Sequence, residues 1–206
     1  MTLIFAPEGR IAQVLGRALR LERELDGPWL IHGGQVGRYE VVLLETERGK
    51  VAAAAAVAYA RQRFNPSQAF GVGLAQALDP QLKPLDLIVA QDGVQYDLAF
   101  GAPTEHLVAA DPVLSQRVLR AAQALGQPVR TGRVATADRS PSNPAEVAHL
   151  RERLAADVAE TGGAAALWSA RKTGIPLALI RMVGDAEHLE PAARHLAELM
   201  VKVLEG

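Results

Sequence analysis

Acidic side chains that directly follow apolar strands are the groups in this sequence best suited to chemistry. The segment from Ile175 to Val183 is apolar apart from one arginine, which is typical of a strand buried on both faces, and Gly184 and Asp185 follow it. Ligands bind to open α/β sheets in the loops beyond the carboxyl ends of the strands. Asp185 is therefore a candidate acid–base group. The alternative is that it caps a turn before the last helix.

Several other loops after predicted strands carry groups that would converge with Asp185 if all the strands enter one sheet. Each group also has an ordinary structural interpretation, such as the first turn of a helix for Glu8 and Arg10, or a solvated surface for Glu160. Together they suggest a binding site more strongly than any of them does alone. The set consists of Glu8, Arg10, Gly71, Gly73, Tyr96, Asp97, Thr136, Asp138, Glu160 and Thr161.

Common ligand-binding motifs do not fit the sequence. Gly49-Lys50 lacks the upstream glycine of a phosphate-binding loop, and the residue after the lysine is a valine. Gly71-Val-Gly73 begins like a dinucleotide fingerprint but lacks the third glycine. The five histidines are scattered without metal-ligand spacing. We therefore expect neither a metal nor a cofactor.

The composition limits the class of protein. The chain has 206 residues, of which 49% are hydrophobic, and a formal net charge of −1. That length suits one core, and the balanced charge and scarce aromatics disfavour a nucleic-acid surface. No apolar run approaches the roughly 20 residues needed to cross a bilayer. The absence of cysteine and of a leader-like start favours the cytoplasm.

Strand-like and helix-like segments alternate along the chain without a repeat, which predicts one α/β domain over residues 1–206 with a largely parallel or mixed central sheet. A turn is expected at residues 32–35, where two glycines follow a histidine. The expected strands are 3–6, 29–31, 39–45, 68–72, 85–91, 129–136 and 177–183, and the expected helices are 8–25, 51–63, 112–125, 146–154, 163–173 and 191–204.

The order of these segments resembles the nucleoside phosphorylase superfamily, most closely its methylthioadenosine/adenosylhomocysteine nucleosidases. Arg48–Ala54 is similar to that family's Gly-Lys-Val-Ala-Ala helix start, and Leu82–Val89 to its Leu-Lys-Val-Gly-Asp-Ile-Val-Val segment. Ile175–Asp185 is similar to its Val-Pro, hydrophobic strand and Arg-Ala-Ile-Ser-Asp. The resemblance implies three layers with a central mixed sheet flanked by helices, a homodimer, and a small-molecule nucleoside as ligand.

The same resemblance implies hydrolysis of the N-glycosidic bond of a purine nucleoside without a cofactor. Asp185 would protonate the departing base from a desolvated carboxylic acid, which contributes about 10²–10⁴-fold in rate. Glu8 would be a substitute base for water, and Glu160 with Thr161 would contact the ribose. The remaining substrate contacts implied by the family's pattern are Gly71, Gly73, Tyr96 and Asp138.

The chain departs from the family at two glutamate positions. Gly162 stands where the family's ribose-binding glutamate lies, and Arg10 aligns with the glutamate that activates water. An arginine cannot act as a general base at neutral pH. Beside a developing ribosyl cation it would cost roughly 4 kcal/mol at about 4 Å and an effective dielectric near 20. Arg10 therefore either points away or binds an anion.

Three functions are compatible with these residues. The first is a nucleosidase, with Asp185 as acid and Glu8 as base. The second is a phosphate-dependent phosphorylase in which Arg10 helps to hold phosphate. The third is a catalytically inactive homologue that binds a nucleoside.

Overall fold

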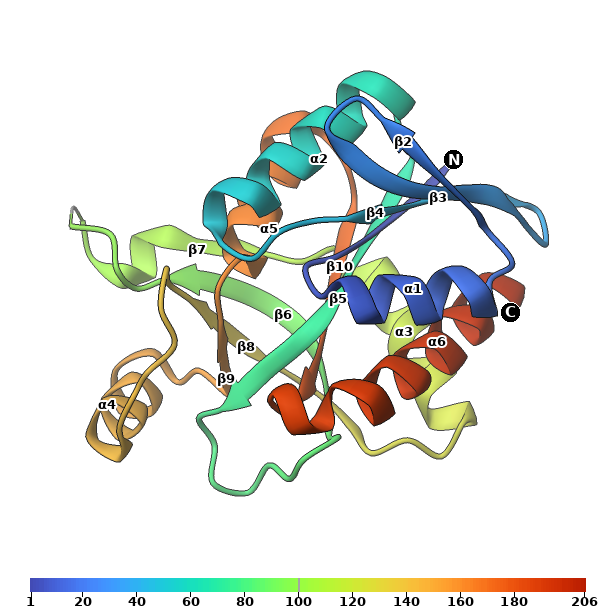
Figure 1. Ribbon diagram of the computed structural model, residues 1–206. Helices are drawn as coiled ribbons and strands as arrows, with labels where there is room; N and C mark the ends of the chain where they lie inside the picture. The colour runs from blue at the N-terminus through green and yellow to red at the C-terminus, as the bar shows by residue number, and fades with distance from the viewer. Residues whose placement is uncertain (100) are drawn as a thin grey trace.

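The computed structural model describes residues 1–99 and 101–206 and contains a mixed β-sheet with helices on both sides (Figure 1). The strands are β1 (Thr2–Ala6), β2 (Glu22–Asp26), β3 (Trp29–Val36), β4 (Tyr39–Glu45), β5 (Gln68–Ala77), β6 (Leu87–Gln95), β7 (Leu107–Ala109), β8 (Val129–Thr136), β9 (Val158–Glu160) and β10 (Leu177–Val183). The α-helices are α1 (Gly9–Ala18), α2 (Lys50–Phe64), α3 (Pro112–Ala124), α4 (Pro144–Leu154), α5 (Gly163–Thr173) and α6 (Leu189–Glu205).

The long strand β5 organises the sheet. Its first half pairs in parallel with β1, its last two residues pair with β9, and its other edge pairs in parallel with β10. The strand order β10-β6-β8-β9-β5 closes on itself through the β10–β5 pairing, and β1, β4, β3 and β2 extend the sheet from β5. The parallel strands β1, β4, β5 and β10 therefore send their carboxyl ends in the same direction.

Two hydrophobic cores cover the two faces of the sheet. Helices α2 and α5 pack on each other over one face, and α1, α3 and α6 cover the other (Figure 1). In α2 the buried side of the helix is built mainly from alanines, such as Ala53, Ala56 and Ala60, so α5 can pack close to it. The predicted three-layer α/β fold is confirmed.

The predicted helix over residues 8–25 is wrong in its second half. α1 ends at Ala18, Arg20 takes a φ of 55°, and the chain continues as the exposed strand β2. Residues Glu22 to Asp26 are mostly good helix formers, but they pair along their whole length with β3. Pairing between strands therefore overrides the local helical preference.

The turn predicted at residues 32–35 is also wrong. Gly33 and Gly34 lie inside β3 and pair with β4, and the turn comes later, at Gly37, where φ is 55°. A Cβ atom at Gly34 would lie 3.1 Å from Leu21 Cδ2, so this glycine permits close approach of the segment before β2. Likewise β5 does not end before Gly73 but runs on to Ala77.

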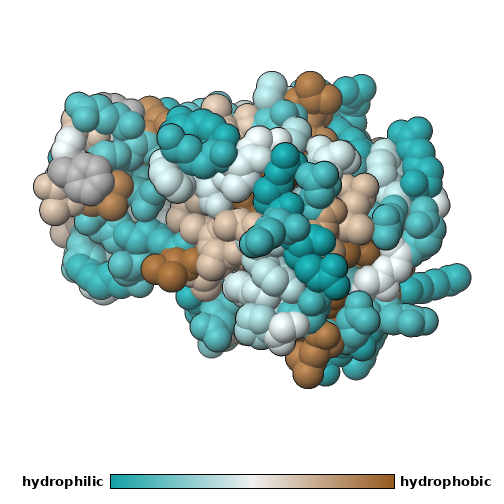
Figure 2. Space-filling model, turned by 90° about the horizontal axis from the view of Figure 1, so that it is seen from above, coloured by the Kyte–Doolittle hydropathy of each residue, from teal (hydrophilic) through white to brown (hydrophobic). Residues whose placement is uncertain are grey.

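The surface of the molecule has no single dominant hydrophobic face in the view of Figure 2. Seen from above, it is mainly hydrophilic, and its most hydrophobic residues form separate patches (Figure 2). No helix among the described residues is both long and apolar enough to span a bilayer.

Candidate active site

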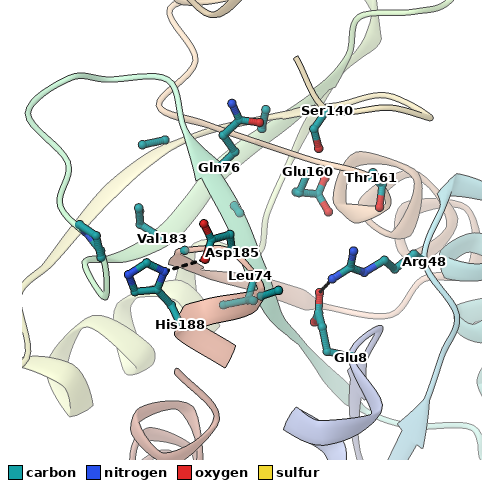
Figure 3. Close-up of a pocket in the computed structure, with 16 residues that line it drawn as sticks. Glu8, Arg48, Leu74, Gln76, Ser140, Glu160, Thr161, Val183, Asp185 and His188 are labelled. Carbon is teal, nitrogen blue, oxygen red and sulfur yellow. Dashed lines mark hydrogen bonds and ion pairs between the residues drawn. The ribbon is translucent and has the colours of Figure 1, made fainter. Parts of the chain in front are cut away.

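The carboxyl ends of three parallel strands place polar residues around one cavity. Glu8 follows β1, Arg48 follows β4, and Asp185 follows β10. The cavity, which we call the main cavity, measures about 480 Å³, within the range of small-molecule sites. Figure 3 shows Glu8 and Arg48 pointing toward each other, with Leu74 between them and the Asp185–His188 pair. The lining residues that matter here are Glu8, Arg48, Leu74, Ser140, Glu160, Thr161, Asp185 and His188.

Glu8 is a buried carboxylate at the edge of the main cavity. It is the N-cap residue of α1 and only 9% exposed, and its Oε2 atom is buried without a hydrogen-bond partner. Burial raises the pKa of Glu8, while the guanidinium groups of Arg181 and Arg48 oppose that rise. A Cβ atom at Gly73 would lie 3.0 Å from Glu8 Oε2. Gly73 therefore makes room for Glu8 rather than lining the main cavity itself.

Glu160 is buried and fully engaged. Its carboxylate accepts hydrogen bonds from the backbone N–H groups of Gly162 at 2.9 Å and Gly163 at 2.8 Å, and from the hydroxyl of Thr136. Arg181 Nη2 donates a fourth, at 3.1 Å. These donors fix the start of α5 and the Arg181 side chain. Glu160 lines the main cavity, but its two oxygens already accept hydrogen bonds from groups of the protein.

A second, small cavity of about 30 Å³ lies beside the main one and shares Glu8, Leu74, Glu160 and Thr161 with it. Arg181 also lines it, and the Nε atom of this buried arginine has no hydrogen-bond partner. A polar compartment of this volume can hold one water molecule. Glu8 and Arg181 thus both line this small cavity, and each has one buried polar atom, Oε2 and Nε respectively, without a hydrogen-bond partner.

Asp185 lies where the sequence placed it, but it is not the desolvated acid that was expected. It lines the main cavity with a side chain that is 70% exposed. Its Oδ1 atom accepts from the backbone N–H of Glu187 at 3.0 Å and lies 2.8 Å from His188 Nδ1. The hydrogen bond from His188 is the main cause that holds the pKa of Asp185 below its usual value.

Arg10 takes no part in the main cavity. Its Nε donates to Glu190 Oε2 at 2.6 Å and its Nη2 to Glu190 Oε1 at 3.0 Å, so α6 holds the guanidinium in a bidentate pair. Of the two positions that the sequence allowed for Arg10, the structure shows the one pointing away from the site. The prediction that Arg10 binds an anion there is not supported.

Tyr96 and Asp138 line a neighbouring cavity of about 580 Å³, which shares only Ser140 with the main cavity. Tyr96 Oη donates to the carbonyl of Arg139 at 3.0 Å, and burial raises the pKa of Tyr96. Asp97 accepts two hydrogen bonds from Lys50, at 2.7 and 2.8 Å. The structure therefore does not bring Tyr96 and Asp138 into contact with Glu8 and Asp185.

Gly71 lies in the core, contrary to the prediction that it contacts substrate. It pairs with Phe5 and Leu179 in the centre of the sheet, and a Cβ atom there would lie 2.5 Å from Phe5 Cζ. The glycine is needed for packing in β5.

Three residues of the site were missed as functional candidates. In the sequence Arg48 is part of the helix-start motif, His188 is one of the scattered histidines, and Arg181 lies within an apolar strand. A charged residue inside an otherwise apolar strand is a signal that could have identified Arg181, since an ion buried in a core needs a partner. Among the described residues, no group of three or more acidic, histidine or cysteine side chains is placed to hold a metal ion.

Comparison with known proteins agrees with this architecture. Residues 4–205 match the protein family described as the phosphorylase superfamily. An aminodeoxyfutalosine nucleosidase of Campylobacter jejuni is 30% identical over 156 residues, which cover 71% of this chain and 68% of the relative. A 5′-methylthioadenosine/S-adenosylhomocysteine nucleosidase of Geobacillus kaustophilus is 28% identical, covering 98% of this chain and 95% of the relative.

Solved structures show the same fold. The crystal structure of a Campylobacter jejuni 5′-methylthioadenosine/S-adenosylhomocysteine nucleosidase superposes with a TM-score of 0.92 at 23% identity, covering 99% of this chain and 98% of that one.

Proposed function

The chain belongs to the phosphorylase superfamily, and from that premise we propose that it hydrolyses the N-glycosidic bond of a purine nucleoside. The named relatives are nucleosidases, which supports the reaction class. The observation that carries the proposal for this chain is the small cavity beside Glu8. It offers a place for a water molecule next to a buried carboxylate, at the edge of a cavity large enough for a nucleoside.

In the proposed reaction, the bond between the ribosyl C1′ and the purine N9 breaks, and its electron pair stays with the base. Asp185 delivers a proton to the imidazole ring of the purine, which makes the base a better leaving group. The water oxygen bonds to C1′, and Glu8 takes the proton that the water loses. The products are the free base and the free sugar.

Glu8 is suited to this role because burial raises its pKa toward neutrality, where a carboxylate is a stronger base. Its unpartnered Oε2 atom remains available to accept a proton. Glu160 is not available in the same way, since four donors already occupy it. Both predicted ribose contacts, Glu160 and Thr161, line the two cavities, and Thr161 is the more exposed of the two residues.

Phosphorolysis has less support. It relied on Arg10 as a phosphate ligand, and Glu190 holds that guanidinium in a bidentate pair outside the main cavity. A homodimer with residues near Tyr96 reaching the neighbouring site, and a cytoplasmic location, stay predictions.

The test is release of free base from a panel of nucleosides, with and without phosphate. The panel contains methylthioadenosine, adenosylhomocysteine, inosine, futalosine and aminodeoxyfutalosine. We expect base release without phosphate, and a loss of about 10²–10⁴-fold in Glu8→Gln. Strict dependence on phosphate would instead indicate a phosphorylase. Binding of nucleosides without any base release would indicate an inactive homologue.

A further inference from the structure

We propose that Arg48 binds an anionic group on the 5′ substituent of the nucleoside, so that the enzyme favours nucleosides with an acidic 5′ tail. This inference rests on the proposed nucleosidase activity and specifies its substrate class. The cationic side chains near the main cavity differ in whether they already have hydrogen-bond partners.

Arg48 is a cation with unused donors. A guanidinium carries five N–H donors in a planar fork. For Arg48 the contact found in the described chain is an ion pair with Glu8 Oε1 at 3.7 Å, which is too long for a hydrogen bond. Nearby cations are already engaged, Lys50 by Asp97 and Arg10 by Glu190. Arg48 is therefore the guanidinium that can still bind a ligand in the main cavity.

The position of Arg48 places it beside the sugar of the proposed substrate rather than beside the base. Asp185 and His188 lie on one side of Leu74, and Arg48 with Glu8 lies on the other (Figure 3). If Asp185 protonates the purine, the base occupies the side of Asp185, and the sugar extends toward Glu8 and Arg48. A group that reaches Arg48 must then be carried on the sugar. The 5′ carbon is the position from which a substituent can extend without displacing the water that attacks C1′.

Charge indicates which kind of substituent would be favoured. A positive charge near the ribosyl cation that forms in the reaction opposes catalysis unless an anion neutralises it. Glu8 can do this only in part, because its contact with Arg48 is long and its own role is to accept a proton from water. A carboxylate on the substrate would neutralise Arg48 through a bidentate pair, the geometry for which a guanidinium is suited.

The experiment compares two nucleosides that differ only in the tail. They are 5′-S-(2-carboxyethyl)-5′-thioadenosine and its methyl ester, and the same pair is made with hypoxanthine as base. The measured quantity is the ratio of kcat/KM for the acid to kcat/KM for the ester. We expect the ratio to be about ten or more in the wild type, and near one in Arg48→Leu. In Arg48→Lys it should lie between these values, because a lysine keeps the charge without the fork.

Arg10→Leu is the matched control, because it also removes an arginine near the end of β1, but one that Glu190 holds outside the main cavity. It should keep the wild-type ratio. A wild-type ratio near one, or a high ratio that survives in Arg48→Leu, would refute the proposal. So would a requirement for inorganic phosphate that disappears in Arg48→Leu, since Arg48 would then hold a co-substrate.

Failure of the activity itself can be told apart from failure of this inference. If no nucleoside releases base in any buffer, the proposed hydrolysis is wrong, and binding of the acid and the ester is measured by calorimetry instead. Tighter binding of the acid that is lost in Arg48→Leu would still support Arg48 as the anion-binding residue. Equal binding of acid and ester by the wild type would refute it.

Discussion

His188 Nδ1 lies 2.8 Å from Asp185 Oδ1, so the carboxylate that lines the main cavity is coupled to an imidazole. This hydrogen bond holds the pKa of Asp185 below its usual value, and the carboxylate is therefore ionised at neutral pH. A proton must reach Asp185 once a nucleoside binds. In the proposed reaction a purine that covers Asp185 would raise the pKa of this carboxylate by excluding water, and His188 Nδ1 is placed to pass a proton to Asp185 Oδ1.

The first prediction concerns Asp185. Asp185→Asn should abolish base release, because an amide cannot deliver a proton to the leaving purine. The side chain is 70% exposed, so the thermal stability of the variant should stay close to that of the wild type. Base release is measured by chromatography and stability by circular dichroism. Wild-type activity in this variant would show that the proton comes from elsewhere.

His188 provides the second prediction. His188→Gln can keep a hydrogen bond to Asp185 but has no proton to transfer, so release of purine should slow by about 10²-fold. The matched measurement uses 4-nitrophenyl β-D-ribofuranoside, whose leaving group needs no protonation. Hydrolysis of this compound should be much less affected in both His188→Gln and Asp185→Asn. An equal loss on both kinds of substrate would indicate that these residues only maintain the shape of the site.

The third prediction concerns the pH dependence of kcat/KM. Glu8 accepts a proton from water only as a carboxylate, and burial raises the pKa of Glu8. Activity should therefore be lost as the pH is lowered through the pKa of Glu8. This loss should occur at a higher pH than it would if the base were an exposed glutamate. Arg48 lowers the pKa of Glu8, so Arg48→Leu should move this acidic limb to still higher pH. Arg10→Leu should leave the limb in place, and a shift of equal size there would contradict the assignment to Glu8.

The sequence predicted the layers and the carboxyl ends of β1, β4, β8 and β10 well, because both depend on local patterns, whereas it ended β3, β5 and β6 too early. An apolar run followed by glycine and a carboxylate identified β10 and Asp185, and the same reasoning placed Glu8, Glu160 and Thr161 beside one cavity. The positions of Glu8 and Asp185 follow from parallel strands that end at one edge of a sheet. Glu160 and Thr161 instead follow β9, which pairs antiparallel with β5.

The sequence could not show which residues the site side chains contact, and these contacts determine whether a side chain is available to a ligand. Arg10 is held by Glu190, 180 residues away, whereas the ion pair of Arg48 with Glu8 is 3.7 Å long and leaves its N–H donors available. The exposure of Asp185 depends on how the chain turns after β10, and its pairing with His188 depends on the short 3₁₀ turn Ala186–His188. The contacts of Arg10 and Arg48 are set by tertiary packing, which no local spacing records.

The fourth prediction tests the buried pair of Glu160 and Arg181. Their side chains are 8% and 3% exposed, and Arg181 Nη2 donates to Glu160 Oε2 at 3.1 Å. Glu160→Gln would leave a buried guanidinium without its carboxylate, so the free energy of unfolding should fall by about 3–5 kcal/mol. Urea unfolding measures this loss. Glu146→Gln, which breaks the pair with Arg139 on the surface, is the control and should change stability little.

The last prediction decides between the two interpretations of Gly71. A Cβ atom at this position would lie 2.5 Å from Phe5 Cζ and 2.8 Å from Phe5 Cε2, closer than packed carbon atoms allow. Gly71→Ala should therefore lower the free energy of unfolding by about 1–3 kcal/mol through overpacking. Urea unfolding measures the change.

A double-mutant cycle with Phe5→Leu provides the control for Gly71, because the smaller side chain makes room for the added methyl group. The two substitutions should be less destabilising together than the sum of their separate effects. If Gly71 instead contacts substrate, Gly71→Ala should raise KM with stability unchanged, and Phe5→Leu should not offset that effect. This second result would mean that the packing of β5 against β1 does not explain the glycine.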